Sequence, residues 1–281
     1  MREELPAVAA ARMAQIRSSG TWGSSLTVGE FAAVRSAGFE PVGQVLGASV
    51  YGAGSARASS CPPALGPVVQ AMYQARHTAI ERMTSECAQL GGHGVVGVRL
   101  SRGSFSLGGL EFTAIGTAVR APGAVGERRE PFTCDLSGQD FAKLITAGWV
   151  PAGLALGVSI GSRHDDRTTA RQARWTAGNA EVAGWTELVN ESRREARRQL
   201  EDDVRRLGAE GVVIAAMQLR VSQRDCPAAV GRRDHLVEAT VIGTAIVRFS
   251  RAGPRPAELA LTVMPLDSRR TGSAGRGSEP R

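Results

Sequence analysis

The chain has 281 residues, of which 42% are hydrophobic and 22% charged, and its formal net charge is +7. These values are typical of a soluble globular protein with one or two domains. No apolar run reaches the 18 residues of a membrane-spanning helix. The early run "AVAAA" follows acidic residues and stops at Arg12, which is unlike an export signal. The four cysteines form no C-x-x-C pair, which favours reduced thiols in the cytoplasm over a disulfide framework or a zinc knuckle.

Arginine carries almost all of the positive charge, since Lys143 is the only lysine. A nucleic-acid surface needs clustered basic residues with aromatic side chains nearby, and aromatic residues are only 5% of the chain. We therefore expect neither a nucleic-acid nor a membrane partner. The last stretch, "SRRTGSAGRGSEPR", has no apolar face to bury, so we predict a flexible basic tail over residues 251–281.

The first predicted element is a helix in "TVGEFAAVRSAG" that ends at Gly38, and a strand "PVGQVLGASVYG" follows it. After a loop, apolar residues recur every three or four positions, which predicts a long helix whose buried stripe runs from Met72 through Ala79 and Met83 to Cys87. This helix ends at Gly91. The continuous apolar run "GVVGVRL" predicts a buried strand, and a hairpin leads to the strand "EFTAIGTAVR".

Three blocks of this pattern recur later in the chain. Residues 31–49 match 141–159, residues 90–97 match 207–214, and "LEFTAIGTAV" at 110–119 matches "VEATVIGTAI" at 237–246. The sequence therefore predicts two related modules, 24–121 and 134–250. Each is a β-α-β-β unit of an α+β protein, with one helix packed on a small mixed sheet.

Three motifs resemble the YbjQ-like family, also called UPF0145 or "putative heavy-metal-binding domain" proteins. They read "ARHTAIERM", "LGGHGVVGV" and "EFTAIGTAV" in the first module, and "SRREARRQL", "LGAEGVVIA" and "EATVIGTAI" in the second. The sequence departs from the family at Ile115 and Ile242, where a tyrosine is usual, and the second module lacks the Ala-Arg pair. The resemblance implies a homo-oligomer, typically a ring, with a binding or scaffolding role that is poorly defined. Exposed sheet edges completed by neighbouring modules supply a physical reason for such rings.

The alternative function that the resemblance implies is heavy-metal binding, with a transition metal held at module or subunit seams. The candidate ligands are His77, Cys87 and His93. None recurs in the second module, where the matching residues are Arg194, Val204 and Glu210. Cys87 also fits a buried hydrophobe, and His93 a capping or solvent-facing residue. The sequence places Cys61, His164, Cys226 and His235 in loops or insertions.

Four polar positions recur in both modules: Arg76 with Arg193, Glu86 with Asp203, Glu111 with Glu238, and Thr117 with Thr244. The glutamates and threonines could line a ligand pocket or a subunit interface. The glutamates could instead form ion pairs with Arg76 or Arg193, within a module or across an interface. No nucleophile elbow, P-loop, dinucleotide fingerprint or H-E-x-x-H helix occurs, so we expect no catalytic activity.

Overall fold

The computed structural model describes residues 6–52, 65–105, 109–123, 130–226 and 233–249. The predicted tail at 251–281 and Cys61 lie outside these residues. The described elements belong to one compact unit, and they combine helices with two β-sheets, which confirms the α+β class.

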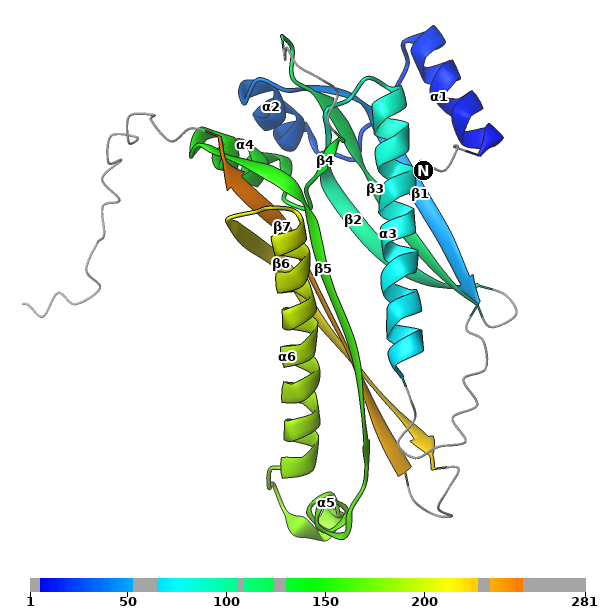
Figure 1. Cartoon of the computed structure of the whole chain (residues 1–281), viewed down its shortest axis with the longest axis vertical. Coiled ribbons are helices and arrows are strands. Elements are labelled where there is room, and N and C mark those ends of the chain that lie inside the picture. The colour runs from blue at the N-terminus through cyan, green and yellow to red at the C-terminus, as the bar shows by residue number, and fades with distance from the viewer. Residues whose placement is uncertain (1–5, 53–64, 106–108, 124–129, 227–232, 250–281) are drawn as a thin grey trace, which may run out of the picture. The chain divides into compact units, whose positions relative to one another are not determined.

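The first half of the chain builds a four-stranded sheet with the order β1-β3-β2-β4 (Figure 1). Both β1 and β2 pair antiparallel with the central β3, while β4 pairs parallel with β2. The elements in chain order are α1 (Ala7–Ser19), α2 (Val28–Ser36), β1 (Glu40–Gly52), α3 (Gly66–Gln89), β2 (Gly94–Phe105), β3 (Gly109–Arg120) and β4 (Phe132–Thr133).

The second half builds a three-stranded sheet with the order β5-β7-β6, in which both pairs are antiparallel. Its elements are α4 (Gly138–Thr146), β5 (Trp149–His164), α5 (Arg167–Gln172), η2 (Trp175–Ala177), α6 (Ala183–Arg206), β6 (Gly211–Asp225) and β7 (Arg233–Arg248). The first sheet is therefore mixed, as expected, because β4 pairs parallel with β2. The second sheet is antiparallel, and among the described residues no strand pairs with the outer edge of β6.

The local sequence explains where the short helices begin. Thr27 and Glu30 form a reciprocal capping box at the start of α2, and the Ser137 hydroxyl accepts a hydrogen bond from the Asp140 N–H at the start of α4. The sequence reading missed α1, because its apolar residues show no marked single face. This helix buries Met13, and its Arg12 forms an ion pair with Glu86 of α3.

Each long helix packs on its sheet across a glycine. A Cβ on Gly47 of β1 would lie 1.9 Å from the backbone oxygen of Ala79 in α3, and one on Gly157 of β5 would lie 1.8 Å from that of Ala196 in α6. A buried carboxylate beside each contact accepts a backbone hydrogen bond from the strand. Glu86 accepts from the Leu46 N–H at 2.8 Å, and Asp203 accepts from the Leu156 N–H at 3.0 Å.

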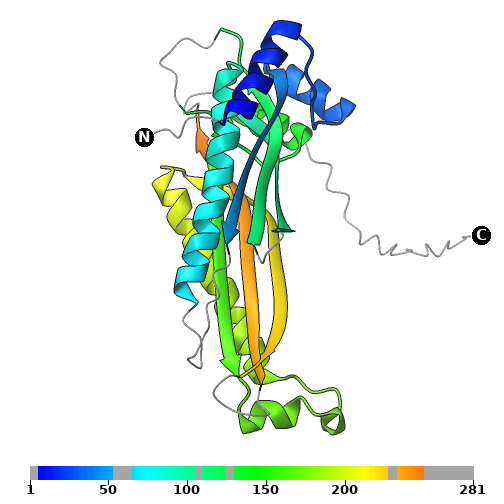
Figure 2. The same ribbon diagram turned by 90° about the vertical axis from the view of Figure 1, so that its right-hand side faces the viewer.

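Helix α3 also contacts the second sheet, so that the two halves share one hydrophobic core (Figures 1 and 2). Leu154 and Leu156 of β5 are buried in the same cluster as Ile80 and Met83 of α3. Helix α6 packs on the opposite face of β5 and β7, against Ala155, Ala239 and their neighbours. The layers therefore follow the order first sheet, α3, second sheet, α6.

Candidate functional site

A pocket opens at the seam between the two halves of the chain, where β2, β3 and α3 meet β6 and β7. Charged and polar side chains from both halves line it together with Phe112; they include Arg76, Arg102, Arg220, Glu238 and Thr240. Three arginines face a single carboxylate, so the pocket is suited to a small anionic or hydrogen-bonding ligand.

Glu238 is the electrostatic centre of this pocket. It accepts hydrogen bonds from Arg102 at 2.7 and 2.6 Å, and Arg76 Nη2 lies 3.7 Å from its Oε1. Arg76 is buried and stacks over the Phe112 ring, 4.5 Å from its centroid. Burial lowers the pKa of Arg76 to about 10, opposed by Glu238 and reinforced by Arg102 and Arg220. The site residues Arg76 and Glu238 thus meet across the seam.

The matching pair, Glu111 and Arg193, is not brought together. Glu111 lies on β3 beside Val50 and Gly103, on the face of the first sheet that points away from α3. Arg193 is exposed on α6. Both side chains remain available for a contact outside the chain.

The two threonines hold the segments that precede α2 and α4. The Thr117 hydroxyl oxygen accepts a hydrogen bond from the Ser25 N–H at 3.0 Å, and the Thr244 hydroxyl oxygen accepts one from the Asp135 N–H at 3.1 Å. Thr244 also donates its hydroxyl proton to the Asp135 carboxylate. Because both threonines are fully buried, they anchor backbone rather than line the pocket.

A second polar cluster at the seam surrounds Asp203. Its carboxylate accepts hydrogen bonds from the Tyr73 hydroxyl and from Arg206, and His77 Nε2 lies 3.5 Å from its Oδ2. Burial and the hydrogen bond to Asp203 raise the pKa of Tyr73 to about 12. Burial opposes ionisation of Asp203, but interactions with His77, Tyr73 and the Leu156 N–H outweigh it and lower the pKa.

The three predicted metal ligands lie in separate environments. His77 belongs to the Asp203 cluster, while Cys87 is buried in the core and donates its thiol proton to the Gly94 carbonyl at 3.3 Å. Burial raises the pKa of Cys87 to about 12, which disfavours the thiolate that a metal needs. His93 is exposed, and its Nδ1 accepts a hydrogen bond from the Ala121 N–H at 3.1 Å.

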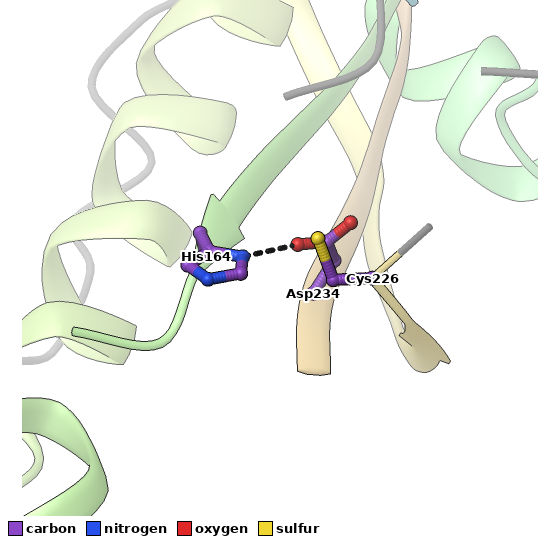
Figure 3. A group of neighbouring side chains, drawn as sticks. All are labelled: His164, Cys226 and Asp234. Atoms are coloured by element: carbon purple, nitrogen blue, oxygen red, sulfur yellow. Dashed lines mark hydrogen bonds and ion pairs between the residues drawn. The ribbon is translucent and has the colours of Figure 1, made fainter. Parts of the chain in front are cut away.

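A different set of potential ligands comes together among the described residues. His164, Cys226 and Asp234 place one ligand atom each within 4.8 Å of the others (Figure 3). The sequence placed His164, Cys226 and His235 in loops or insertions. Both histidines lie outside the repeated blocks but in strands rather than loops: His164 ends β5 and His235 lies in β7, while Cys226 directly follows β6. Sequence spacing could not reveal the set, since strand pairing alone aligns position 164 with position 234.

Several residues are buried at the seam while their sequence-matched counterparts are exposed. Leu156 of β5 is 0% exposed under α3, whereas Leu46 of β1 is 38% exposed. Val96 of β2 is 0% exposed, whereas Val213 of β6 is 37% exposed. The first half of the chain therefore exposes the counterpart of a residue that the second half buries at the seam, and the second half exposes the counterpart of a residue that the first half buries there. Among the described residues, no helix is long and apolar enough to cross a membrane.

Comparison with known proteins places these features in a wider context. A family model described as "Putative heavy-metal-binding" matches residues 64–122, the part of the chain that holds α3, β2 and β3. The encapsulin nanocompartment protein Rv1762c of Mycobacterium tuberculosis is 33% identical over 271 residues, which cover 94% of this chain and 98% of that protein. A UPF0145 protein of Vibrio campbellii is 45% identical over 49 residues, 17% of this chain and 47% of that protein.

Proposed function

The chain belongs to the family of the mycobacterial encapsulin nanocompartment protein, and from this premise we propose that it is a non-catalytic scaffolding protein that assembles with copies of itself. The proposal adds that the two halves arose by tandem duplication of a YbjQ-like module. The observation that carries it is the seam between the halves. The sequence-matched counterparts of the two surfaces that meet at this seam are exposed, one on the first half of the chain and the other on the second.

The backbone contact at the seam is an added strand. Segment 132–134 joins the outer edge of β2, with the Phe132 N–H donating to the His93 carbonyl at 3.1 Å and the Cys134 N–H to the Val95 carbonyl at 2.9 Å. The matching segment, residues 22–24, forms no strand, and no described strand pairs with the outer edge of β6. An unpaired edge accepts a strand from another chain. We infer that residues 22–24 of a second copy add to β6.

Hydrophobic packing at the seam follows the same plan. Phe141 of α4 is buried against Val34 of α2 and Val96 of β2. The repeated blocks match these three residues with Phe31, Leu144 and Val213. Phe31 belongs to the first half of the chain, and the other two belong to the second half. A second copy that docked its α2 beside α4 would cover Val213, as Phe141 covers Val96.

The sheet face completes the interface and supplies its charge. At the seam, α3 covers Leu156 and directs Arg76 at Glu238. The open face of the first sheet carries the matching Leu46 and Glu111, and the exposed side of α6 carries Arg193 in place of Arg76. Helix α6 of one copy would therefore bring Arg193 to Glu111 of the next copy. Such a head-to-tail contact joins unlike surfaces, so it builds rings or longer arrays.

The proposal predicts that charge placed on either surface stops assembly. Leu46→Arg and Val213→Arg each bury an unpaired cation in the proposed interface, so each variant should be a monomer at concentrations where the parent chain is an oligomer. Val8→Arg is the matched control, because Val8 is 83% exposed on α1 and lies outside the proposed contact. Native mass spectrometry and light scattering measure the subunit number.

Mixing the two variants tests whether the contact joins unlike surfaces. The Leu46→Arg chain keeps the surface around Val213 on its second half intact. The Val213→Arg chain keeps the surface around Leu46 on its first half intact. An equimolar mixture should form a one-to-one dimer and nothing larger, because only one interface remains functional. A parent chain that stays monomeric at all concentrations, or variants that assemble like the parent, would refute the proposal.

A further inference from the structure

Three strand ends of the second sheet bring a histidine, a thiol and a carboxylate together (Figure 3). His164 is the last residue of β5 and pairs in register with Asp234 of β7. Asp234 pairs in turn with Arg224 of β6, and Cys226 lies two residues beyond Arg224. Residues two apart on a strand share a face, so these side chains gather on one side of the sheet.

The next residue of β7, His235, points to the opposite face of the sheet and already has contact partners there. His235 contacts Asp165, with Nε2 3.0 Å from Oδ2, and its ring packs against Trp185 at 4.6 Å between centroids. His235 belongs to the α6 side of the sheet, because Trp185 lies in α6. The two histidines at this end of the sheet therefore serve different groups.

The set of His164, Cys226 and Asp234 has the chemistry of a transition-metal site. Asp234 and Cys226 are buried, and the His164 side chain is 24% exposed, so the set is enclosed with one side open to solvent. His164 Nδ1 lies 2.9 Å from Asp234 Oδ1, while the other carboxylate oxygen of Asp234 accepts a hydrogen bond from Arg224 at 3.2 Å. Arg224 thus orients the carboxylate and leaves Oδ1 directed at His164.

We propose that His164, Cys226 and Asp234 bind one divalent transition-metal ion, of which Zn²⁺ is the best match. Imidazole, thiolate and carboxylate are the three ligand types that zinc accepts in proteins, and the ligand atoms of a tetrahedral site lie about 3.3–3.8 Å apart. The three atoms already lie within 4.8 Å of one another, so small rotations about the side-chain bonds would close the site. Water would complete the coordination.

Binding requires a defined movement of protons. The thiol of Cys226 loses its proton to solvent and forms the metal–sulfur bond as thiolate. Coordination through Nδ1 uses the His164 tautomer whose proton is on Nε2, so the 2.9 Å contact between Nδ1 and Asp234 Oδ1 is replaced by bonds from both atoms to the metal. At least one proton is therefore released for each ion bound.

This site is separate from the proposed assembly function and from the three residues that the sequence predicted as ligands. The family model described as heavy-metal-binding matches residues 64–122 and includes none of the three ligands. The site also lies within one half of the chain rather than at the seam, since β5, β7 and the residue that follows β6 supply all of it.

Co²⁺ is the probe for the experiment, because a cobalt–thiolate bond produces an intense near-ultraviolet charge-transfer band. The metal-free full-length chain, titrated with CoCl₂, should bind one ion per chain with this band, and Zn²⁺ should displace it. Cys226→Ser should abolish the band and weaken Zn²⁺ binding about 100-fold. The matched control Cys87→Ser removes a buried core thiol and should leave the band intact. Calorimetry in buffers of different ionisation enthalpy should show proton release that Cys226→Ser loses.

A second variant keeps the test decisive if Cys226→Ser does not fold. His164→Ala alters a partly exposed side chain at a strand end, and it should weaken Co²⁺ binding about 100-fold while far-ultraviolet circular dichroism stays unchanged. Absence of Co²⁺ binding in the parent chain overturns the proposal. Binding without the thiolate band, or a band that survives Cys226→Ser and disappears in Cys87→Ser, overturns it equally.

Discussion

At the scale of single residues, the same residue type has opposite environments at matched positions. Glu238 sits between Arg76 and Arg102 in the seam, whereas Glu111 lies on an open sheet face. A partly buried carboxylate between two arginines compensates charges that would otherwise be buried alone. Glu238 is therefore a structural link between the halves as well as part of the pocket.

Removing this charge should destabilise the protein more than removing a surface charge. Glu238→Gln leaves the buried Arg76 without a counter-ion, so we expect the free energy of unfolding to fall by about 2 kcal/mol. Glu40→Gln is the control, because Glu40 and Arg120 form a 3.0 Å ion pair with side chains 50% and 48% exposed; its cost should stay below about 1 kcal/mol. Urea unfolding measures both, and equal losses would contradict the structural role of Glu238.

At the scale of elements, close packing of helix on strand depends on two glycines at matched positions. Gly47 and Gly157 let the backbones of α3 and α6 approach β1 and β5 until no Cβ fits between them. This approach lets Glu86 and Asp203 reach strand N–H groups from the helices. The glycines thus decide the spacing of the layers.

A methyl group at this contact should force the helix away from its strand. Gly47→Ala places a Cβ 1.9 Å from the Ala79 carbonyl oxygen, so we expect a loss of about 3 kcal/mol in unfolding free energy. Gly52→Ala on the same strand is the control, since a Cβ there meets nothing within 4 Å. Thermal unfolding of the two variants compares them, and similar melting temperatures would show that the layers adapt at little cost.

At the scale of the whole molecule, the core buries thiols that must stay protonated. Burial raises the pKa of Cys87 and that of Cys134 from 9.0 to about 12. The unfolded chain ionises these thiols near pH 9, whereas the folded chain does so only near pH 12. Their contribution to stability is therefore complete below pH 9 and is lost as the pH rises from 9 to 12.

This linkage predicts alkaline destabilisation that depends on the thiols. Between pH 9 and 12, each thiol should lower the free energy of unfolding by about 1.4 kcal/mol per pH unit. Cys87→Ala should reduce the slope by that amount, although the variant is less stable at neutral pH. Ser85→Ala on the same helix is the control and should retain the slope of the parent. Guanidinium unfolding across this pH range measures it, and equal slopes for parent and Cys87→Ala would contradict the assignment.

The sequence by itself determined the α+β class and predicted the long helix and the strands that pack with it, because hydrophobic period and glycine punctuation are local properties of the chain. It also identified Arg76, Glu238 and their counterparts as recurring polar positions that line a pocket or an interface, or form ion pairs. Tertiary structure alone decided that Arg76 meets Glu238 while Arg193 and Glu111 stay apart, since only one seam can form within one chain. It also decided that His164, Cys226 and Asp234 meet, because pairing between strands 70 residues apart, as His164 and Asp234 are, depends on the register of the whole sheet.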